Sequence, residues 1–548
     1  MASADMPVER TMFVRKATGL VKGWSVFDAF IYSALSINLI TLGFGYAFTG
    51  IAVLPQSALI AAVVLSALFI VFEVMVYASL VAVMPRAGGD YVWQTRIIGG
   101  GIGFVMAATG WWFILSHWVP IYANILAVEV IQPTLTILGF TGTSAFHADW
   151  WPYSASDGNG IFFTSVLTAI LASVIIALGM RTYAKIQKYC FYGGMIGLVL
   201  MVLIFLTHSH QDFIAAYNNS AHNLYGVKGD AYHQTVAAGG GFSTPGFGSF
   251  PVKETFLLLP FIVFYNLWPN WGATLYGEVR GASDFRKNIY AMGGALVFMT
   301  VITVITLGAM AHSVGLDFYG ILSGEYWLTV VKEPFYLFPY PGTLAAFFYS
   351  NELVQLAIIW LLGLWFLGWA GTLFLSSTRM IFAAAFDRVL PEWAGRVSDR
   401  GVPWYALLLI MIPGVIVSYL YSYVTGFSKL TLDASLVIAV TFFGTAIAAT
   451  ILPWWKKDIY QKSPIARYAI GGLPIISIAG AITTVVLGWV IYEWLWNPLY
   501  GIGIGNTQSI QFLAAIYVIA AVVYVAARVV RRQQGVDLDA IHSEIPAE

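Results

Sequence analysis

Residues 56–91 run QSALIAAVVLSALFIVFEVMVYASLVAVMPRAGGDY. Over residues 56–83 the only charged side chain is Glu73. A helix needs about 20 mostly apolar residues to cross the hydrocarbon of a membrane, and this stretch is long enough. Pro85 and the glycine pair after it favour a turn. We therefore predict a transmembrane helix over 56–83, closed by a tight turn.

The composition of the whole chain extends this interpretation. Of the 548 residues, 59% are hydrophobic and 10% are charged, whereas about 25% of the residues of a soluble domain are charged. The formal net charge is zero, which provides no basic surface for a nucleic acid. Cys190 is the single cysteine, and this excludes a disulfide framework and multi-cysteine metal sites. The sequence predicts an integral membrane protein without a metal or another cofactor.

The length rule predicts an all-α polytopic membrane protein with twelve transmembrane helices. The apolar runs lack the alternation that is typical of barrel strands. The predicted spans, in chain order, are residues 25–49, 56–83, 99–130, 160–179, 187–207, 255–277, 289–313, 352–386, 403–423, 431–453, 470–493 and 508–528.

The loops between these spans divide the lysines and arginines unevenly. The two termini and every second connection hold 23 of them, and the remaining connections hold 4. Positive charge collects on the cytoplasmic side of membrane proteins, so both termini are expected in the cytoplasm and the chain in the cytoplasmic membrane. Residues 1–22 are polar and basic without an apolar core, which predicts a cytoplasmic arm rather than a signal peptide.

Two of the external connections are long. Residues 208–254 are rich in Gly, Ser, Asn and His, and we expect a mobile external loop rather than a second domain. Residues 314–351 are aromatic and are expected to form short helices over the outer mouth.

Spans 1 and 6 are candidates for broken helices. The polar residues Ser33, Ser36 and Asn38, with Ile37 between the last two, interrupt the middle of span 1. Span 6 contains Tyr265, Asn266, Trp268, Pro269 and Asn270. Proline removes a helix hydrogen bond and disturbs the preceding turn. Transporters built from inverted repeats bind substrate at such breaks, one in each repeat. The alternative is a proline kink in a packed helix, but the pairing of the two spans favours a substrate site.

Three motifs resemble those of the amino acid–polyamine–organocation (APC) transporter superfamily. The turn after span 2, Met84–Tyr91, is similar to P-R-[SA]-G-G-x-Y, and Gly277–Arg280 after span 6 is similar to G-E-V-[KR]. At the end of span 8, Ser377–Pro391 resembles S-x-R-x-x-x-A-x-x-x-D-x-x-x-P, and Gly401-Val402-Pro403 matches the entry to span 9. The resemblance covers residues 23–460, with all motifs on the predicted cytoplasmic side.

This resemblance implies a five-plus-five inverted repeat, in which spans 1, 2, 6 and 7 move against spans 3, 4, 8 and 9. It implies a substrate site at the breaks of spans 1 and 6. The expected divisions are a cytoplasmic arm at 1–22, a first repeat at 23–207, the external loop at 208–254, a second repeat at 255–453, spans 11 and 12 at 454–528 and a cytoplasmic tail at 529–548.

The chain also departs from the family pattern. The first break has no G-x-G signature, and Ser79 stands where family members often have an acidic residue. Gly194 stands where some proton-coupled members have a lysine. A sodium site needs paired hydroxyls midway along span 8, where residues 361–375 offer only Thr372.

Few ionisable groups lie within the predicted spans. Glu73 is 12 residues before Pro85, about 18 Å along a helix, which places it near the midplane. It must be paired, hydrated or protonated there, and proton carriage competes with a structural hydrogen bond. His117 either lines the substrate path or joins two helices. Asp28 either favours the N-terminus of its helix or pairs at an inner gate, and Glu278 is a candidate for gate and loop ion pairs. No catalytic residue or metal ligand is expected.

The leading hypothesis is a secondary transporter that moves an amino acid or a related amine by alternating access, coupled to protons. An exchanger, an uncoupled facilitator and a transporter-like sensor are the alternatives. A haem-binding respiratory subunit is disfavoured because only His117 lies well within the membrane, and no hydrolase motif is present.

Overall fold

A computed structural model describes residues 20, 22–139, 159–246, 248–328, 334–335, 337–424 and 426–545. Within these residues the only sheet is a hairpin of β1 (Ala469–Ile470) and β2 (Leu473–Pro474), and all other regular structure is helical. Eleven helices in the described part are long and apolar enough to cross a membrane. The predicted all-α polytopic class is confirmed.

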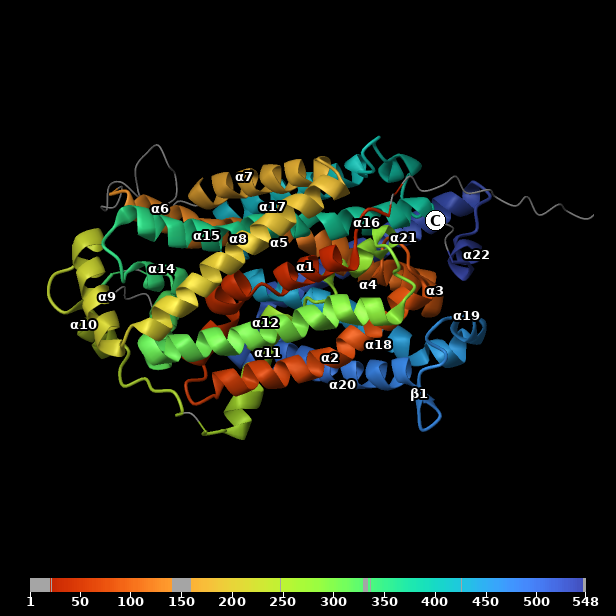
Figure 1. Cartoon of the computed structure of the whole chain (residues 1–548). Helices are drawn as coiled ribbons and strands as arrows, with labels where there is room; N and C mark the ends of the chain where they lie inside the picture. The colour runs from red at the N-terminus through yellow and green to blue at the C-terminus, as the bar shows by residue number, and fades with distance from the viewer. Residues whose placement is uncertain are drawn as a thin grey trace, which may run out of the picture.

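The long helices run along one common direction (Figure 1). They are α1 (Val26–Ile37) with η1 (Leu39–Ala47) and η2 (Phe48–Ala52), α2 (Leu59–Val83), α4 (Gly100–Ala108) with η3 (Thr109–Phe113), α5 (Ile114–Leu126), η4 (Ala127–Ile131) and α6 (Gln132–Ile137), α7 (Asn159–Ala177), α8 (Met180–Thr207), α11 (Val252–Asn266) with η5 (Trp271–Glu278), α12 (Phe285–Ser313), α15 (Glu352–Ala370) with α16 (Thr372–Phe386), α17 (Trp404–Tyr423), α18 (Thr431–Trp455), α20 (Ile475–Trp496) and α21 (Thr507–Gln533).

The sixth predicted span explains why eleven helices qualify instead of twelve. It consists of α11 and the 3₁₀ helix η5 with non-helical residues between them, so neither part alone is long enough to cross. The third predicted span is longer than expected, because helical structure continues from Gly100 to Ile137. Such a helix exceeds the thickness of the hydrocarbon, so it tilts or extends beyond it.

The expectation of a mobile loop over residues 208–254 is wrong in part, since two helices form there. These are α9 (His210–Tyr225) and α10 (Ala231–Ala238). Ser209 caps α9 through a capping box with Asp212, and the Ser209 hydrogen bonds hold the pKa of the Asp212 carboxyl below its usual range. The capping box and the helix that follows give this connection defined structure.

Residues 314–351 contain short helices, as predicted. These are α13 (Leu316–Trp327) and α14 (Pro341–Ala346). Figure 1 shows α9, α10 and α14 at one end of the bundle, and α19 (Lys457–Gln461), α22 (Leu538–Ser543) and the carboxyl terminus at the other end. The predicted external and cytoplasmic connections therefore lie at opposite ends, while the repeat boundaries of the chain stay predictions.

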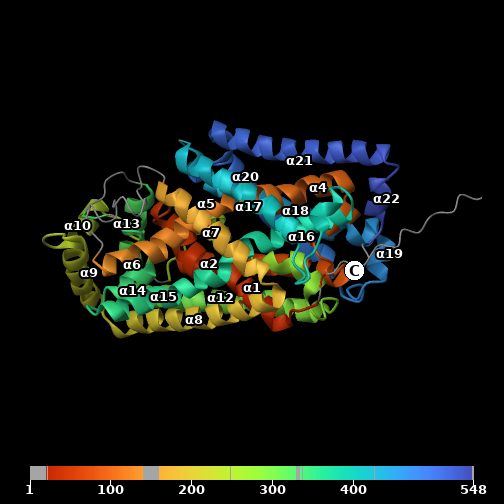
Figure 2. The ribbon, with the colours of Figure 1, turned by 90° about the horizontal axis from the view of Figure 1, so that it is seen from above.

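The helices pack in two groups that matter for the site. The first group consists of α1, α2, α11 and α12. In it α12 packs against α1 and α2, and α11 packs against α2. The second group consists of α5, α7, α16 and α17, in which α17 packs against each of the other three. The last long helix, α21, runs along one edge of the molecule (Figure 2).

Glycines allow α8 and α15 to pack closely. A Cβ at Gly197 would stand 2.8 Å from the backbone nitrogen of Leu362, and one at Gly194 would stand 3.0 Å from the Trp365 ring. The Trp365 ring therefore lies against the position at which the motif resemblance leads us to compare Gly194 with a lysine.

Candidate functional site

The first helix changes its winding at Asn38. Ser25 and Asp28 form a capping box that starts α1, which continues to Ile37. Asn38 adopts a left-handed conformation (φ 50°, ψ 71°), and its Oδ1 accepts a hydrogen bond from the backbone N–H of Thr41 at 3.1 Å. Asparagine tolerates this conformation better than other side chains do. The α-helix therefore ends within the bundle and a π-helix continues the span.

The second break separates α11 from η5. Leu267 to Asn270 lie outside both helices, and Pro269 has no N–H with which to continue the α-helix. Asn270 precedes η5 but does not cap it with its side chain. Its amide is free to bond elsewhere.

Hydrogen bonds join the two breaks and bring Glu73 to them. The Ser33 hydroxyl donates to the backbone oxygen of Pro269 at 2.7 Å, and the Asn270 Nδ2 donates to Glu73 Oε1 at 2.9 Å. A Cβ at Gly272 would stand 3.1 Å from the Tyr32 ring, so a larger side chain would push the two segments apart. Side chains from α1, α2 and the broken sixth span meet at one place.

Four buried polar atoms around the breaks have no hydrogen-bond partner within the described part of the chain. They are Asn38 Nδ2, Asn266 Nδ2, Asn270 Oδ1 and Glu73 Oε2. Each of these residues is at most 1% exposed. Buried polar atoms are almost always paired, so two donors and two acceptors without partners indicate a place for a polar ligand or for water.

Aromatic rings cover the same region. Trp271 lies with its ring centroid 4.7 Å from that of Trp111 and 5.3 Å from that of Trp268. Trp118 stacks on Phe264 at 5.8 Å. This lining suits an apolar side chain beside the polar atoms of the breaks.

The other predicted site residues on the breaks lie in the same neighbourhood, but their polar groups bond to other groups of the protein. The Ser36 hydroxyl donates to the Tyr32 oxygen of its own helix, and Ile37 is fully buried as the last residue of α1. The Tyr265 hydroxyl bonds to Thr303 at 2.6 Å. The Trp268 indole donates to the Phe264 oxygen.

Thr372 is attached to the site through its backbone. Its oxygen accepts from the Trp271 indole at 3.2 Å, and its hydroxyl donates to the Trp369 oxygen. Ser376 donates to the Trp271 oxygen at 3.0 Å. The Thr372 backbone oxygen and the Ser376 hydroxyl thus hold η5 against α16.

The structure does not bring His117 to the breaks. Its ring is 1% exposed and packs against Tyr421, Phe427 and Phe512, 5.3 to 5.7 Å between centroids. Neither ring nitrogen has a hydrogen-bond partner among the described residues. The side chain faces α17, η7 (Phe427–Leu430) and α21 instead of the substrate path.

The two gate candidates are both in ion pairs. Asp28 pairs with Lys188 of α8 at 2.8 Å, and Glu278 pairs with Arg379 of α16 at 2.7 Å. Glu278 and Arg379 are 1% and 0% exposed. Separating a buried ion pair of this kind is costly unless both charges reach water. Such a cost would suit a gate that stays closed.

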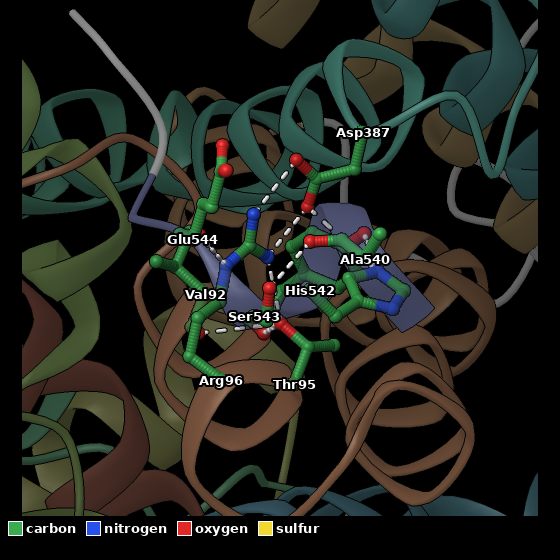
Figure 3. A network of polar contacts seen from close by, with 9 residues as sticks. Val92, Thr95, Arg96, Asp387, Ala540, His542, Ser543 and Glu544 are labelled. Atoms are coloured by element: carbon green, nitrogen blue, oxygen red, sulfur yellow. Dashed lines mark hydrogen bonds and ion pairs between the residues drawn. The ribbon is translucent and has the colours of Figure 1, made fainter. Parts of the chain in front are cut away.

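A second buried ion pair, Arg96–Asp387, holds the described end of the carboxyl-terminal tail. Arg96 donates to both oxygens of Asp387, at 2.5 and 2.7 Å, and to the backbone oxygen of Glu544 (Figure 3). His542 lies beside Tyr91, 3.4 Å from its hydroxyl. The tail thereby packs against α3 (Asp90–Ile97) and the end of α16.

Three further acids are buried, and their burial is not evident from the sequence. Glu129 and Asp433 lie toward the predicted outer ends of their spans but are 2% and 0% exposed. Glu129 accepts from the Thr41 hydroxyl at 3.2 Å, and Asp433 accepts from Ser509. Asp90, also fully buried, lies within the motif P-R-A-G-G-D-Y. The proline and glycines of this motif account for the turn but not for the buried acid.

A family model described as amino acid permease matches residues 27–525, which is most of the chain and includes both breaks. The chain belongs to the amino acid permease family. The APC resemblance stated from the motifs is confirmed. Amino acid permeases are membrane transporters and not enzymes, and the apolar helices place this permease in a membrane as a multi-pass protein.

A curated relative supports the same assignment. The permease is 20% identical over 452 residues to a branched-chain amino acid permease, BcaP, of Lactococcus lactis subsp. cremoris (strain MG1363). The alignment covers 80% of this chain and 84% of that protein. An amino acid substrate follows from the family.

Proposed function

We propose that this permease is a proton-coupled secondary transporter that moves an apolar amino acid across the cytoplasmic membrane by alternating access. The observation that carries the proposal is the junction of the two breaks, where Ser33 bonds to Pro269 and Asn270 bonds to Glu73. Broken helices at membrane depth are tolerated where they line a ligand cavity. Substrate binding at the breaks and proton binding at Glu73 are then linked through one amide side chain.

The unpartnered polar atoms fit the two charged ends of an amino acid. Asn38 and Asn266 offer amide donors to a carboxylate, and Asn270 offers an amide oxygen to an ammonium group. Half-helix ends add favourable dipoles, with N-termini facing the carboxylate. The tryptophan lining favours an apolar side chain, and the relative named for branched-chain amino acids agrees with that choice.

Alternating access is supported by two ion pairs that join the broken spans to neighbouring helices. The Glu278–Arg379 pair links the broken span to α16, and Asp28–Lys188 links α1 to α8. Both pairs lie toward the predicted cytoplasmic end, below the breaks. Breaking them would open a path from the site to that side.

The test is uptake into proteoliposomes of a labelled panel of apolar, polar and charged amino acids, with and without a pH gradient. The wild-type permease should accumulate apolar amino acids only when the outside is more acidic. If no amino acid is accumulated or exchanged, the transport proposal is wrong. Accumulation driven by a sodium gradient without a pH gradient would reject proton coupling.

A Glu73→Gln variant tests the coupling residue. Glutamine keeps an acceptor for the Asn270 amide but carries no exchangeable proton, so pH-driven uptake should be lost while exchange of substrate for substrate persists. Glu352→Gln, at the exposed start of α15, is the matched control and should behave like wild type. Persistent pH dependence in Glu73→Gln would exclude Glu73 as the proton carrier.

A further inference from the structure

A second buried carboxyl lies close to Glu73 and has the opposite kind of surroundings. Asp90 is fully buried at the start of α3. Its oxygens accept from the Tyr77 hydroxyl at 2.5 Å, the Thr445 hydroxyl at 2.5 Å and the Trp111 indole at 2.9 Å. Three donors surround a group that is, in the described residues, in no ion pair.

The donors show which protonation state the surroundings of Asp90 fit. A tryptophan N–H can only donate, and Thr445 already accepts from Gln94 Nε2 at 2.7 Å, so its own proton points to Asp90. A carboxylate accepts all three bonds, whereas a protonated acid would place a fourth proton among three donors. Hydrogen bonds to the charged form stabilise it. Asp90 is built to remain an anion.

Glu73 has the reverse surroundings. One amide donor reaches its Oε1, and its Oε2 has no partner in the described part of the chain. The Asn270 amide that bonds to it also has an oxygen without a partner, which is an acceptor for a carboxylic-acid proton. An acid with one donor and no cation fits a proton-carrying group.

Tyr77 connects the two carboxyls. It lies four residues after Glu73 and therefore on the same face of α2, and its hydroxyl donates to Asp90. Glu73 and Asp90 are thus linked through one turn of α2 and the Tyr77 hydroxyl. The Tyr77–Asp90 bond also joins α2 of the first helix group to α3, while Trp111 continues from Asp90 to Trp271 at the break.

We propose that Asp90 is a positioning residue for proton coupling, a fixed negative charge that keeps the proton on Glu73 while α2 and α3 are in contact through Tyr77. The inference rests on the proposed role of Glu73. When Tyr77 moves away with α2, Glu73 leaves the field of this charge and releases its proton more easily.

Among the groups named around Glu73, Asp90 is the one that carries a negative charge and can act in this way. Tyr77 lies one turn away on the same helix, and its hydroxyl bonds to Asp90 on α3. The broken sixth span presents to it the neutral amide of Asn270. Neither carboxyl has a described lysine, arginine or histidine partner in an ion pair.

The experiment is the pH dependence of uptake by Asp90→Asn in proteoliposomes. Removing the negative charge makes Glu73 easier to ionise, so its protonation requires a more acidic solution. The midpoint of pH-dependent uptake should move about one pH unit to the acid side, the size typical of interacting buried acids. Asp90→Glu restores the charge and should return the midpoint toward the wild-type value.

The matched control is Asp433→Asn. Asp433 is also fully buried and also accepts a short bond from a hydroxyl, that of Ser509, but it lies at the outer start of α18. Its neutralisation should leave the midpoint unchanged. An Asp90→Asn variant with reduced uptake and an unmoved midpoint would show that Asp90 has only a structural role and would overturn the proposal.

Infrared spectroscopy of the purified protein provides a readout that does not need transport. The carboxylic-acid C=O band lost in Glu73→Gln belongs to Glu73, and its titration midpoint should fall by the same amount in Asp90→Asn. Where this variant gives little folded protein, Asp90→Ser removes the same charge and keeps an acceptor, and the same shift is expected. An unchanged band midpoint in either variant contradicts the proposal.

Failure of this inference is distinguishable from failure of the proposed function. If Glu73→Gln still shows pH-driven uptake, Glu73 is not the coupling residue and the proposed function fails. If Glu73→Gln loses pH-driven uptake but neutral variants of Asp90 leave the Glu73 band in place, only the role of Asp90 fails.

Discussion

Two serine hydroxyls on the first helix differ in whether they bond to the other break or to their own helix. Ser33 and Ser36 lie one turn apart on α1, and the sequence offers no reason to treat them differently. Only Ser33 reaches the other break, because its hydroxyl donates to Pro269 while Ser36 donates back to its own helix. The direction in which a short polar side chain bonds is decided by tertiary contacts.

Ser33→Ala should weaken substrate binding, because the Pro269 oxygen loses its donor and the two breaks lose their direct link. A hydrogen bond of this kind contributes about 1 kcal/mol net, which corresponds to an affinity about fivefold lower. The measurement is substrate-induced thermal stabilisation of the purified permease. Ser36→Ala is the control and should retain wild-type affinity, and equal losses in the two variants would contradict the role given to Ser33.

The position of a residue along its helix can be counted in the sequence, but the direction in which its side chain faces cannot. Counting from Pro85 predicts that Glu73 lies near the midplane, and in the structure its side chain bonds to Asn270 at the second break. No such count shows that Glu129 and Asp433 face the protein interior. Of the two roles weighed for His117, the packing of its ring against α17, η7 and α21 does not favour the substrate path.

At the scale of elements, the two breaks differ in how clearly the sequence indicates them. Pro269 is a local signal, because a proline cannot continue a helix. Asn38 has no such signal, and its left-handed conformation is maintained by the packing of α1 against its neighbours. Helix α9 was missed because a polar composition suggested a loop, although its capping box at Ser209 and Asp212 is legible in the sequence.

The contact of α8 with α15 gives an element-scale prediction. In Gly197→Ala the new methyl group would meet the backbone of Leu361 and Leu362, which cannot move aside cheaply. Overpacking of this kind costs about 1–3 kcal/mol. Thermal unfolding of the purified protein should show a lower midpoint.

Gly308→Ala in α12 is the matched control, since nothing lies within 4 Å of its added Cβ. Alanine is the better helix former, so this variant should be as stable as wild type or more stable by up to about 1 kcal/mol. Gly197→Ala with unchanged stability would mean that the two helices are packed less closely than described.

For the whole molecule, the fold class and family followed from composition, hydropathy and a few motifs, because the membrane permits few architectures. The orientation rests on the distribution of positive charge and is open to a direct test. Cys190 is buried, so we expect little labelling of the native chain by a thiol reagent.

We expect Ala215→Cys in α9 to react with a membrane-impermeant maleimide in intact cells, and Gln461→Cys in α19 to react only after permeabilisation. Both positions are exposed and lie at opposite ends of the bundle. Labelling is read by the mass change of the purified protein. The reverse pattern would place both termini outside.

Trp24 ties the start of the chain to the far end of the broken span. Its backbone forms a parallel bridge with Val279 through bonds to Glu278 and Arg280, and its ring stacks on Tyr183. Trp24, near the described start of the chain, is therefore fixed at the point where η5 ends. A fluorophore attached near residue 22 would be carried along by each displacement of η5, and single turnovers could be followed optically from outside the bilayer.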